Sequence, residues 1–457
     1  LKQDAYYEIR GDLALPMRRF HGWIKINLIQ TFCGVPKGKE GYSILDLGCG
    51  KGGDLQKFYH SGAKLYVGVD LSLEDANGRD SIWTRYKGLS RKYSDFLPCF
   101  FLQGDIGARL TSQEQYKALG FSKPGSKEVF QKFLSFKRPY LFDRVSIQLA
   151  IHYMFRSALV WDNFCWNLNT YLKPGGYFLA TTFDGQRVRE KLKDKERAIF
   201  AYTSEGGKKQ ILTEIVKRYS LPDTETEIGL GHAIDVHNAW ISQPGTYQTE
   251  YLVDPSFLIR ELEAKCSLKL VETGTFDTLY YLNREYFLQV VKEIPDKTLR
   301  NFLMEARKYY NLKDEINRAA FESTRLNRFY VFRKETRKQK GGDPLLARFE
   351  SQLGPTFTVY PEIEENDQTF SQSIVFADGR LDFPEEKDYQ LCPARMEKIA
   401  RTNRRTFVIL EAETGKVKIH GNASTLLLLY STRGGFYPVV EGKKTLFSRK
   451  DSQLADL

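Results

Sequence analysis

The sequence contains no apolar run long enough to span a membrane. No stretch approaches the roughly eighteen consecutive apolar residues that a transmembrane helix requires. Nor does the chain show a charged segment followed by a short apolar one, the pattern of a secretory signal. We therefore expect an intracellular protein that makes no membrane contact.

Cysteine is scarce and scattered along the chain. No C-x-x-C pair occurs, so the sequence predicts neither a disulfide framework nor a zinc site, and we expect no bound metal. Such a chain suits a reducing compartment. The cysteines are Cys33, Cys49, Cys99, Cys165, Cys266 and Cys392.

Acidic residues are in short supply over most of the chain. From residue 341 onward there are 15 Lys and Arg against 17 Asp and Glu, a net charge of −2. Because the whole chain carries +11, residues 1–340 carry +13. A basic excess confined to one part points to a polyanionic partner such as nucleic acid, although a basic surface also aids solubility.

Length and texture divide the sequence in two. At 457 residues the chain is too long for one ordinary core. The polar stretch from Lys334 to Asp343 separates an α/β pattern from a β-rich one. We therefore expect one domain at 1–335, a linker at 336–343 and a β-rich module at 344–457. The leading leucine suggests a piece of a longer chain.

The C-terminal module contains one clear hairpin pattern, TFVILEAETGKVKIH, with its turn at Glu413-Thr414-Gly415. It lacks the Lys-x-Asp-Gly motif of a guanylyltransferase nucleophile, since Ala377 begins the only similar segment, Ala-Asp-Gly. We therefore expect an accessory or docking module without chemistry of its own.

Short apolar strands alternate with helical patterns in the first domain. This alternation is typical of an α/β fold with helices on both faces of the sheet. Apolar residues at helical spacing between Phe20 and Phe32 predict a helix before the sheet, and residues 106–140 have the pattern of a helical insertion. The predicted strands are Ser43–Leu47, Leu65–Val69, Pro98–Leu102, Phe142–Leu149, Tyr177–Thr182, Leu268–Glu272 and Phe329–Phe332.

The strongest local pattern is YSILDLGCGKGGDLQKF at 42–58, a strand followed by a glycine-rich turn and a helix. Such glycines let a ligand approach the backbone beside the helix N-terminus. A P-loop needs Ser or Thr after its lysine, and Lys51 is followed by Gly52. A dinucleotide site and an S-adenosylmethionine site both fit, since Gly48 begins a G-x-G-x-x-G match and Asp70 ends the next strand, where it can accept both ribose hydroxyls.

Polar residues at later strand ends favour S-adenosylmethionine. Asp46 lies in the end of the first strand, and Asp105 follows the third, where a carboxylate can take the adenine amino group. The segment SIQLAIHYMF at 146–155 puts a Gln, a His and a Tyr in one loop after the fourth strand. A helix that we expect to close at the Lys-Pro-Gly-Gly of 173–176 precedes the fifth. Together these features are unusual for a dehydrogenase.

With these motifs the chain resembles the messenger-RNA cap guanine-N7 methyltransferases, over about residues 1–335. The similar segments are RRFHGWIKINLI at 18–29, LDLGCGKGGDL at 45–55, QLAIHYMF at 148–155 and LKPGGYFLATTFDG at 172–185. The resemblance implies a class I S-adenosylmethionine-dependent methyltransferase fold, a Rossmann-like mixed sheet, with S-adenosylmethionine as donor and the 5′ end of capped RNA as acceptor. Other capping or transcription components are then the expected partners of 344–457. A cellular member is expected in the nucleus, and a viral one in the host cytoplasm or virus particle.

The resemblance also assigns residues. His21-Gly22 stands where the family usually has an asparagine that helps to hold the cap, so we expect an altered contact there. The aromatic contact near RLNRFYVFRK, 325–334, aligns ambiguously and receives no residue. Asp46, Lys25, Gly48, Asp54, Asp70, Asp105 and Gln148 are assigned to the donor, and Lys51, Arg85, His152, Tyr153 and Glu250 to the cap.

Methyl transfer to guanine N7 needs no general base, because N7 carries a lone pair and no proton. The protein has to align the reactants and stabilise charge. Glu250 would accept hydrogen bonds from the N1 and N2 donors of guanine, and these bonds would strengthen as the ring becomes cationic. Tyr153 would stack on the base and His152 donate to it, while Lys51 and Arg85 would meet the triphosphate.

Two alternatives remain open. The acceptor could be another RNA base or a small molecule, or the fold could serve as a non-catalytic binding or stimulatory subunit. The intact turn at Asp46 and Gly48, with Asp70 and Asp105, argues against the second. His232 and His237 lack a third metal-binding partner nearby in sequence, and we interpret them as structural.

Overall fold

The computed structural model describes residues 13–35, 39–73, 81–119, 125–220, 228–295 and 297–335, together with short strands beyond. Two compact units divide the chain. The first comprises residues 1–13, 37–270 and 326–336, and the second comprises 14–36, 271–325 and 337–457. The predicted boundaries at 335 and 343 stay a prediction.

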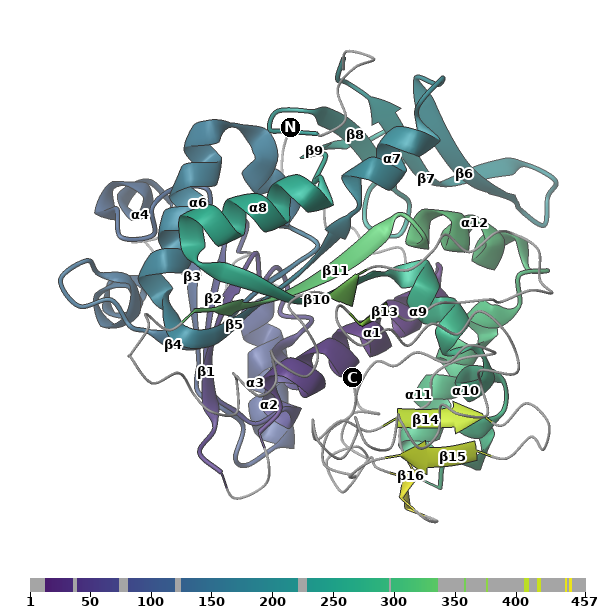
Figure 1. Cartoon of the computed structure of the whole chain (residues 1–457), viewed down its shortest axis with the longest axis horizontal. Coiled ribbons are helices and arrows are strands. Elements are labelled where there is room, and N and C mark those ends of the chain that lie inside the picture. The colour runs from purple at the N-terminus through teal and green to yellow at the C-terminus, as the bar shows by residue number, and fades with distance from the viewer. Residues whose placement is uncertain are drawn as a thin grey trace. The chain divides into compact units, whose positions relative to one another are not determined.

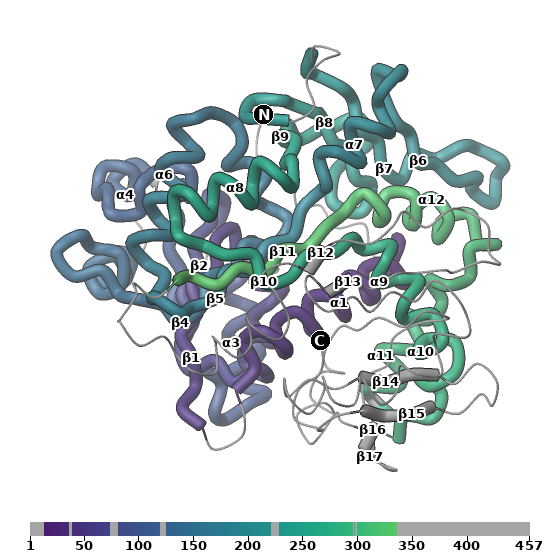
Figure 2. The backbone as a smooth tube through the Cα atoms, in the orientation of Figure 1, coloured from purple at the N-terminus to yellow at the C-terminus, as the bar shows by residue number. Residues whose placement is uncertain are grey.

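A seven-stranded sheet has the order β10-β11-β5-β4-β1-β2-β3, and all of its strands except the later part of β10 belong to the first unit. Strands β3, β2, β1, β4 and β5 are mutually parallel along this order, and β11 runs antiparallel to β5. Figure 2 shows the path of the backbone through these strands. The strands are β1 (Tyr42–Leu47), β2 (Ala63–Asp70), β3 (Cys99–Gln103), β4 (Phe142–Gln148), β5 (Leu172–Phe183), β10 (Leu268–Thr275) and β11 (Asn327–Lys334). All seven strands predicted from the sequence are confirmed.

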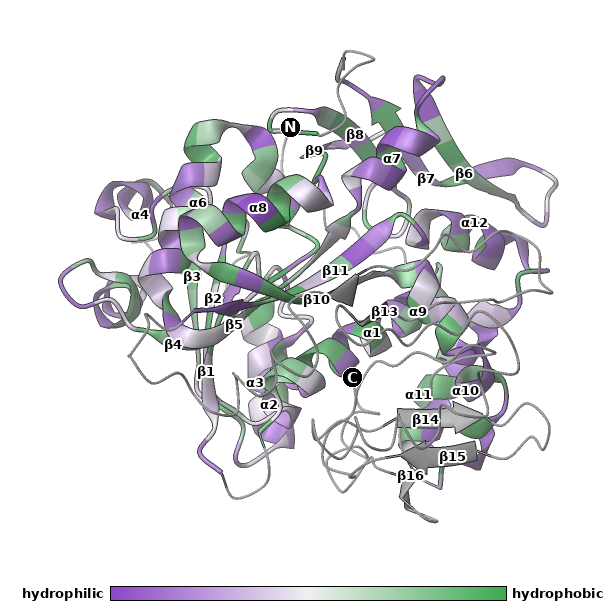
Figure 3. Ribbon diagram, viewed as in Figure 1, coloured by the Kyte–Doolittle hydropathy of each residue, from purple (hydrophilic) through white to green (hydrophobic). Residues whose placement is uncertain are grey.

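Helices cover both faces of this sheet because its strands are apolar on both sides (Figure 1). On one face Leu45, Val145 and Phe178 are buried in a core with α6 and α8, which Figure 3 shows as mixed polar and apolar ribbons. On the other face Tyr66 packs against Phe58 of α2, with ring centroids 5.9 Å apart. The helices are α2 (Leu55–His60), α3 (Ile82–Lys92), α6 (Ala158–Tyr171) and α8 (Pro255–Cys266).

Short polar side chains set where three helices begin. Ser81 accepts a hydrogen bond from the N–H of Thr84 at the start of α3, and Ser157 does the same at α6. Asp254 accepts from the N–H of Phe257 at α8, whose first residue is a proline. Each cap satisfies a donor that the helix itself leaves without a partner.

Two insertions elaborate the sheet. The predicted helical insertion between β3 and β4 is confirmed, and η3 (Ile151–Arg156) follows β4. After β5 the chain forms a separate antiparallel sheet with the order β6-β7-β8-β9. The elements are α4 (Gln113–Leu119), α5 (Ser126–Val129), the π-helical turn η2 (Phe130–Leu134), α7 (Gly185–Lys191), β6 (Arg197–Thr203), β7 (Lys209–Lys217), β8 (Ala233–Asn238) and β9 (Gln248–Tyr251).

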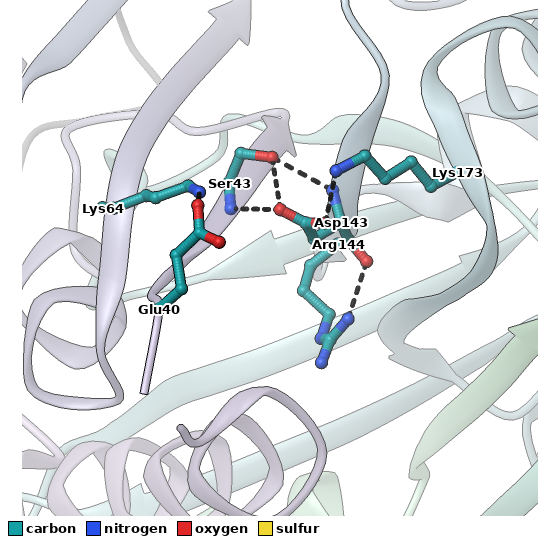
Figure 4. Close-up of polar contacts among 6 residues, drawn as sticks. All are labelled: Glu40, Ser43, Lys64, Asp143, Arg144 and Lys173. Atoms are coloured by element: carbon teal, nitrogen blue, oxygen red, sulfur yellow. Dashed lines mark hydrogen bonds and ion pairs between the residues drawn. The ribbon is translucent and has the colours of Figure 1, made fainter. Parts of the chain in front are cut away.

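A polar cluster ties together the starting ends of β1, β4 and β5 (Figure 4). The carboxylate of Asp143 accepts hydrogen bonds from the N–H and the hydroxyl of Ser43, both at 2.8 Å, and from Lys173 Nζ at 2.7 Å. Partial burial raises the pKa of Asp143, but the bonds from Lys173 and Ser43 outweigh it and hold that pKa below its usual range. The cluster fixes the edge of the sheet opposite the strand ends that carry the predicted site.

The second unit has an aromatic helical core. Phe20 of α1 lies within 6.0 Å, centroid to centroid, of the rings of Tyr280, Phe287, Tyr309 and Tyr310. The helix predicted between Phe20 and Phe32 is confirmed. The elements are α1 (Leu15–Cys33), α9 (Phe276–Leu282), α10 (Arg284–Leu288), η4 (Val290–Glu293), α11 (Lys297–Arg307), η5 (Lys308–Tyr310) and α12 (Glu315–Thr324).

Beyond residue 335 the structure describes only strands. The predicted hairpin is confirmed by β14 and β15, which pair antiparallel with Phe407 opposite His420, while its turn at 413–415 lies outside the described residues. The strands are β12 (Phe357–Thr358), β13 (Val375–Phe376), β14 (Phe407–Leu410), β15 (Val417–His420), β16 (Val440–Glu441) and β17 (Lys444–Thr445). Among the helices described along the chain, none is both long and apolar enough to cross a membrane.

Candidate donor and cap site

The glycine turn after β1 depends on left-handed backbone. Gly48, Gly50 and Gly52 have φ values of 74°, 49° and 71°, a region that other residues enter only at a cost. The N–H of Gly48 donates to the carbonyl of Val69 at 2.8 Å. A Cβ on Gly48 would lie 2.9 Å from the Cβ of Ala150, so the loop after β4 packs directly on the turn.

Asp70 closes the turn from the end of β2. One carboxylate oxygen accepts from the N–H of Gly50 and the other from the N–H of Ser72, both at 2.8 Å. Burial raises the pKa of Asp70, and these two bonds oppose that rise. Because a carboxylate has about four acceptor positions, two remain for a pair of ribose hydroxyls.

Two other acidic residues assigned to S-adenosylmethionine, Asp46 and Asp54, have polar partners within the protein. Asp46 is buried and accepts a hydrogen bond from the hydroxyl of Tyr66 at 2.6 Å. Asp54 is buried just before α2, with its Oδ1 3.1 Å from Lys57 Nζ. Direct contact of either carboxylate with S-adenosylmethionine stays a prediction.

Two donor candidates lie at the ends of β3 and β4. Asp105 Oδ1 accepts from the N–H of Gly107 at 2.8 Å, which forms a tight local turn. The side-chain amide of Gln148 donates to Ser146 Oγ at 3.1 Å and accepts from Thr181 Oγ1 at 3.0 Å. Both residues lie at the carboxyl ends of strands that run parallel to β1, so they are at the same sheet edge as the glycine turn.

His152 and Glu250 form one buried pair, although they are far apart in sequence. His152 lies on η3 and Glu250 on β9, and their Nε2 and Oε2 atoms are 3.6 Å apart. Their exposed fractions are only 4% and 6%. Glu250 is paired in register with the buried Ile234 of β8, which places it on the covered face of the small sheet.

Burial leaves both members of this pair neutral near pH 7. It raises the pKa of Glu250 to about 8 and lowers the pKa of His152 to about 3. A carboxyl held this way ionises more readily once N–H donors approach it, because hydrogen bonds favour the charged form. The pair is thus suited to a polar, N–H-bearing ring edge.

The positions of the remaining predicted residues are Tyr153 next to His152, and Lys51, Arg85 and Lys25 on three other segments of the chain. Tyr153 is half-buried beside His152, with ring centroids 4.2 Å apart. Lys51 is partly exposed in the glycine turn, and Arg85 is exposed on α3. Lys25 lies on α1 in the second unit. The structure thus brings His152, Tyr153 and Glu250 together, while the roles of the three basic residues stay predictions.

His21, which stands where the family usually has an asparagine, lies in the second unit, as Lys25 does. His21 is partly buried, and its Nε2 lies 2.9 Å from Thr324 Oγ1 on α12. Burial first, and the charge of Lys25 second, lower the pKa of His21 to about 3. The ring is therefore neutral and bound to a hydroxyl of its own unit.

Sequence reasoning missed two exposed apolar residues at the strand ends. Leu71 and Leu149 are large apolar side chains that are 37% and 38% exposed, directly after Asp70 and Gln148. Leu149 has a φ of 56°, held by a 2.9 Å hydrogen bond from its N–H to the carbonyl of Thr181. Leu71 could have been found from the sequence, because an apolar residue follows the acidic residue that ends β2. Nothing in the sequence indicates the left-handed conformation of Leu149.

The two downstream histidines have structural surroundings. His237 is buried, and its Nδ1 lies 2.9 Å from the carbonyl oxygen of Thr246. The ring of His232 lies edge-on to that of Tyr219. No group of three or more His, Cys, Asp or Glu side chains in the described part of the chain is arranged to hold a metal ion.

The fold and the glycine turn define the class. Five parallel strands in the order β3-β2-β1-β4-β5, an antiparallel β11, and a glycine turn after β1 make a class I S-adenosylmethionine-dependent methyltransferase fold. Residues 7–204 match the family model of the mRNA (guanine-N(7))-methyltransferase domain. This match confirms the resemblance to the mRNA cap guanine-N7 methyltransferases over residues 7–204.

Two curated relatives are named for mRNA capping or cap methylation. The chain is 39% identical over 345 residues to a probable mRNA-capping enzyme of Acanthamoeba polyphaga mimivirus, covering 72% of this chain and 28% of that protein. It is 32% identical over 178 residues to an mRNA cap guanine-N(7) methyltransferase of Cryptococcus neoformans, covering 39% and 24%. The chain therefore spans about a quarter of the length of these two relatives. A solved structure, the CcbJ methyltransferase from Streptomyces caelestis, aligns with a TM-score of 0.37 and 13% identity over 73% of this chain and 96% of that one.

Proposed function

We propose that this chain transfers a methyl group from S-adenosylmethionine to N7 of the guanine in an RNA 5′ cap. The observation that carries the proposal is the buried pair of His152 and Glu250. His152 belongs to the segment after β4, which packs on the glycine turn through Ala150. A neutral imidazole and an ionisable carboxyl offer a donor and an acceptor, which is what the O6, N1 and N2 edge of guanine requires.

The donor is proposed to lie beside Gly48. Its ribose hydroxyls would use the two acceptor positions that Asp70 leaves open, and its adenine would lie against the exposed side chain of Leu71. Asp105 would accept from the adenine amino group. Asp46 and Asp54 would support the turn, while Lys25 would meet the donor's carboxylate and Gln148 would border its methionine part.

The reaction is proposed to be a single displacement. The N7 lone pair forms the new C–N bond as the C–S bond breaks, and the bonding pair stays on sulfur, which becomes a neutral thioether. Positive charge moves from sulfonium to the purine ring. Glu250, ionised by its hydrogen bonds to N1–H and N2–H, stabilises the cationic ring more than the neutral one, which accelerates the transfer.

The remaining residues are proposed to hold the cap. Tyr153, half-buried beside His152, would stack on the base. Lys51 and Arg85 would neutralise the triphosphate, and the basic excess of residues 1–340 would attract the RNA chain. We propose an intracellular site of action, in the nucleus for a cellular protein and in the host cytoplasm or virus particle for a viral one, with other capping or transcription components as partners of 344–457.

A methyl-transfer assay tests the proposal. Radiolabelled donor would be incubated with GpppRNA, with the same RNA carrying a 5′ triphosphate, and with free GTP. We expect label on GpppRNA and not on the triphosphate RNA, with nuclease digestion yielding m7GpppN. Equal labelling of the two RNAs would place the acceptor elsewhere in the chain. Donor binding without transfer to any of the three would favour a binding subunit.

A further inference from the structure

Thr182 lies behind His152, on the side away from Glu250. It is fully buried near the end of β5, and its Oγ1 lies 3.4 Å from His152 Nδ1. The other ring nitrogen, Nε2, faces Glu250 at 3.6 Å. The imidazole is therefore held between a buried hydroxyl and a buried carboxyl.

A hydroxyl is a different kind of partner from those that usually orient a buried histidine. A carboxylate or a carbonyl only accepts, so it fixes the ring proton on the nitrogen it faces. A threonine hydroxyl can either accept or donate. Because burial keeps the ring of His152 neutral, it carries one N–H and one lone pair, and Thr182 can satisfy Nδ1 in either tautomer.

The two tautomers correspond to two states of the site. Without substrate, Nε2 lies 3.6 Å from the protonated carboxyl of Glu250 and forms no hydrogen bond with it, while the Nδ1–H of His152 is in position to donate to Thr182. When guanine gives its N1–H and N2–H to Glu250, the carboxyl must be ionised, and Nε2 must carry the ring proton to donate to O6. The carboxyl proton then ends on Nε2 and the Nδ1 proton leaves to solvent, a net release of one proton.

We propose that Thr182 is a positioning residue that allows His152 to exchange tautomers as a guanine edge enters and leaves. The inference rests on the proposed function and names a residue that acts through His152, without touching the substrate. It explains why a hydroxyl, and not a carboxylate, stands behind this histidine.

The surrounding backbone keeps Thr182 in register with Glu250. Three residues after Thr182, the N–H of Gly185 donates to the carbonyl of Val253 at 2.8 Å. Val253 lies three residues after Glu250, just beyond the end of β9. The corner at the end of β5 thus holds His152 through one side chain and the Glu250 segment through one backbone bond.

The test compares Thr182→Val, which removes the hydroxyl at nearly constant shape, with Thr182→Ser, which keeps it. Thr213→Val is the matched control, since Thr213 is equally buried in the same unit and bonds to Asn238 at 3.1 Å. For Thr182→Val we expect kcat/KM for capped RNA to fall about tenfold, the usual loss when a buried polar atom loses its partner. Donor affinity should be unchanged, the serine variant should restore most of the activity, and Thr213→Val should affect stability alone.

A second readout does not depend on turnover. Nitrogen-15 NMR of His152, assigned with His152→Gln, reports which ring nitrogen carries the proton. We expect Nδ1–H in the free protein and Nε2–H with GpppG and S-adenosylhomocysteine bound. The same tautomer in both states, or equal kcat/KM for the valine and serine variants, would overturn the inference. Absence of methylation by the unmodified protein would instead overturn the proposed function.

Discussion

Glu250 combines two properties that rarely occur together: it is buried, and it has no cationic partner among the residues that the structure describes. Its nearest described titratable neighbour is His152, whose own burial keeps it neutral. A buried carboxyl without a counter-charge is held protonated, so its ionisation waits for a ligand that brings hydrogen-bond donors. Selection of guanine and stabilisation of the cationic product then follow from the same group.

Replacing Glu250 by glutamine tests this division of labour. The amide would set its NH₂ against the N1 and N2 donors, so we expect kcat/KM for capped RNA to fall at least about hundredfold, in the range for breaking a buried charged pair. Donor affinity, measured by calorimetry, should not change. Asp70→Asn should do the reverse. Equal losses of donor affinity in both variants would contradict the assignment.

The ionisation of Glu250 should also make the free energy of unfolding depend on pH. The folded protein keeps the Glu250 proton up to about pH 8, whereas the unfolded chain loses it near 4.5. The unfolded state therefore binds fewer protons in this window, and stability falls as pH rises. His152 and His21, with pKa values lowered to about 3, have the opposite effect, but only below their ordinary value of 6.5.

Between pH 6.5 and 8 Glu250 thus acts alone among these three. We expect the free energy of unfolding, measured in urea, to fall by about 2 kcal/mol across that range, at about 1.4 kcal/mol per pH unit. In Glu250→Gln the contribution of this group should vanish. A decline of the same size in both proteins would show that another group causes it.

For single residues, the sequence was enough to propose which side chains belong to the site, but it did not predict which of them contact one another. Residue type and position after a strand predicted a role for Asp70, and the resemblance to the family predicted roles for His152 and Glu250. That His152 and Glu250 touch could not be predicted, because Glu250 reaches the site on the inserted β6–β9 sheet, whose placement is tertiary. Thr182 was missed for a related reason, since a threonine within a strand looks like an ordinary sheet residue.

The corner between β5 and α7 is the element on which the site geometry depends. Asp184 caps α7 by accepting from the N–H of Gln186 at 3.0 Å, and it also accepts from Arg328 Nε at 2.7 Å. Gly185 lies so close to the next segment that a Cβ on it would be 2.7 Å from the carbonyl oxygen of Val253. A glycine is required here for close approach rather than for an unusual backbone angle.

Gly185→Ala should therefore displace the Glu250 segment. Overpacking against backbone atoms costs about 1–3 kcal/mol of stability, and we expect kcat/KM for capped RNA to fall with donor affinity retained. Gly88→Ala is the control, because nothing lies within 4 Å of a Cβ at this helical position. Thermal unfolding and steady-state kinetics check both variants. A Gly185→Ala protein with normal kinetics would show that the corner does not position Glu250.

One element differed from its sequence prediction. The segment Lys173–Gly176 was expected to close a helix, but α6 ends at Tyr171 and β5 begins at Leu172. Leu172 is paired with Phe142 and Tyr177 with Arg144, so the intervening residues form an irregularity within the strand. Pro174 cannot extend a helix, and the sequence pattern alone did not show that pairing resumes before it.

At the scale of the whole chain, activity is expected to reside before the linker. The last strand of the large sheet, β11, ends at Lys334, and Lys269 Nζ lies 3.1 Å from Glu335 Oε1 beside it. A chain ended after Asp343 should therefore fold and methylate short capped RNA at the rate of the full chain. Loss of methyl transfer with folding intact, judged by circular dichroism, would show that 344–457 contributes to the chemistry.

The central claim is that one pocket holds a sulfonium donor at Gly48 and a guanine edge at Glu250. A crystal structure with S-adenosylhomocysteine and GpppG tests it most directly. We predict ribose hydroxyls on Asp70, N1 and N2 of guanine within hydrogen-bond distance of Glu250, and N7 facing the sulfur. A guanine bound away from Glu250, or a pocket that takes a nicotinamide dinucleotide in place of the donor, would contradict the account.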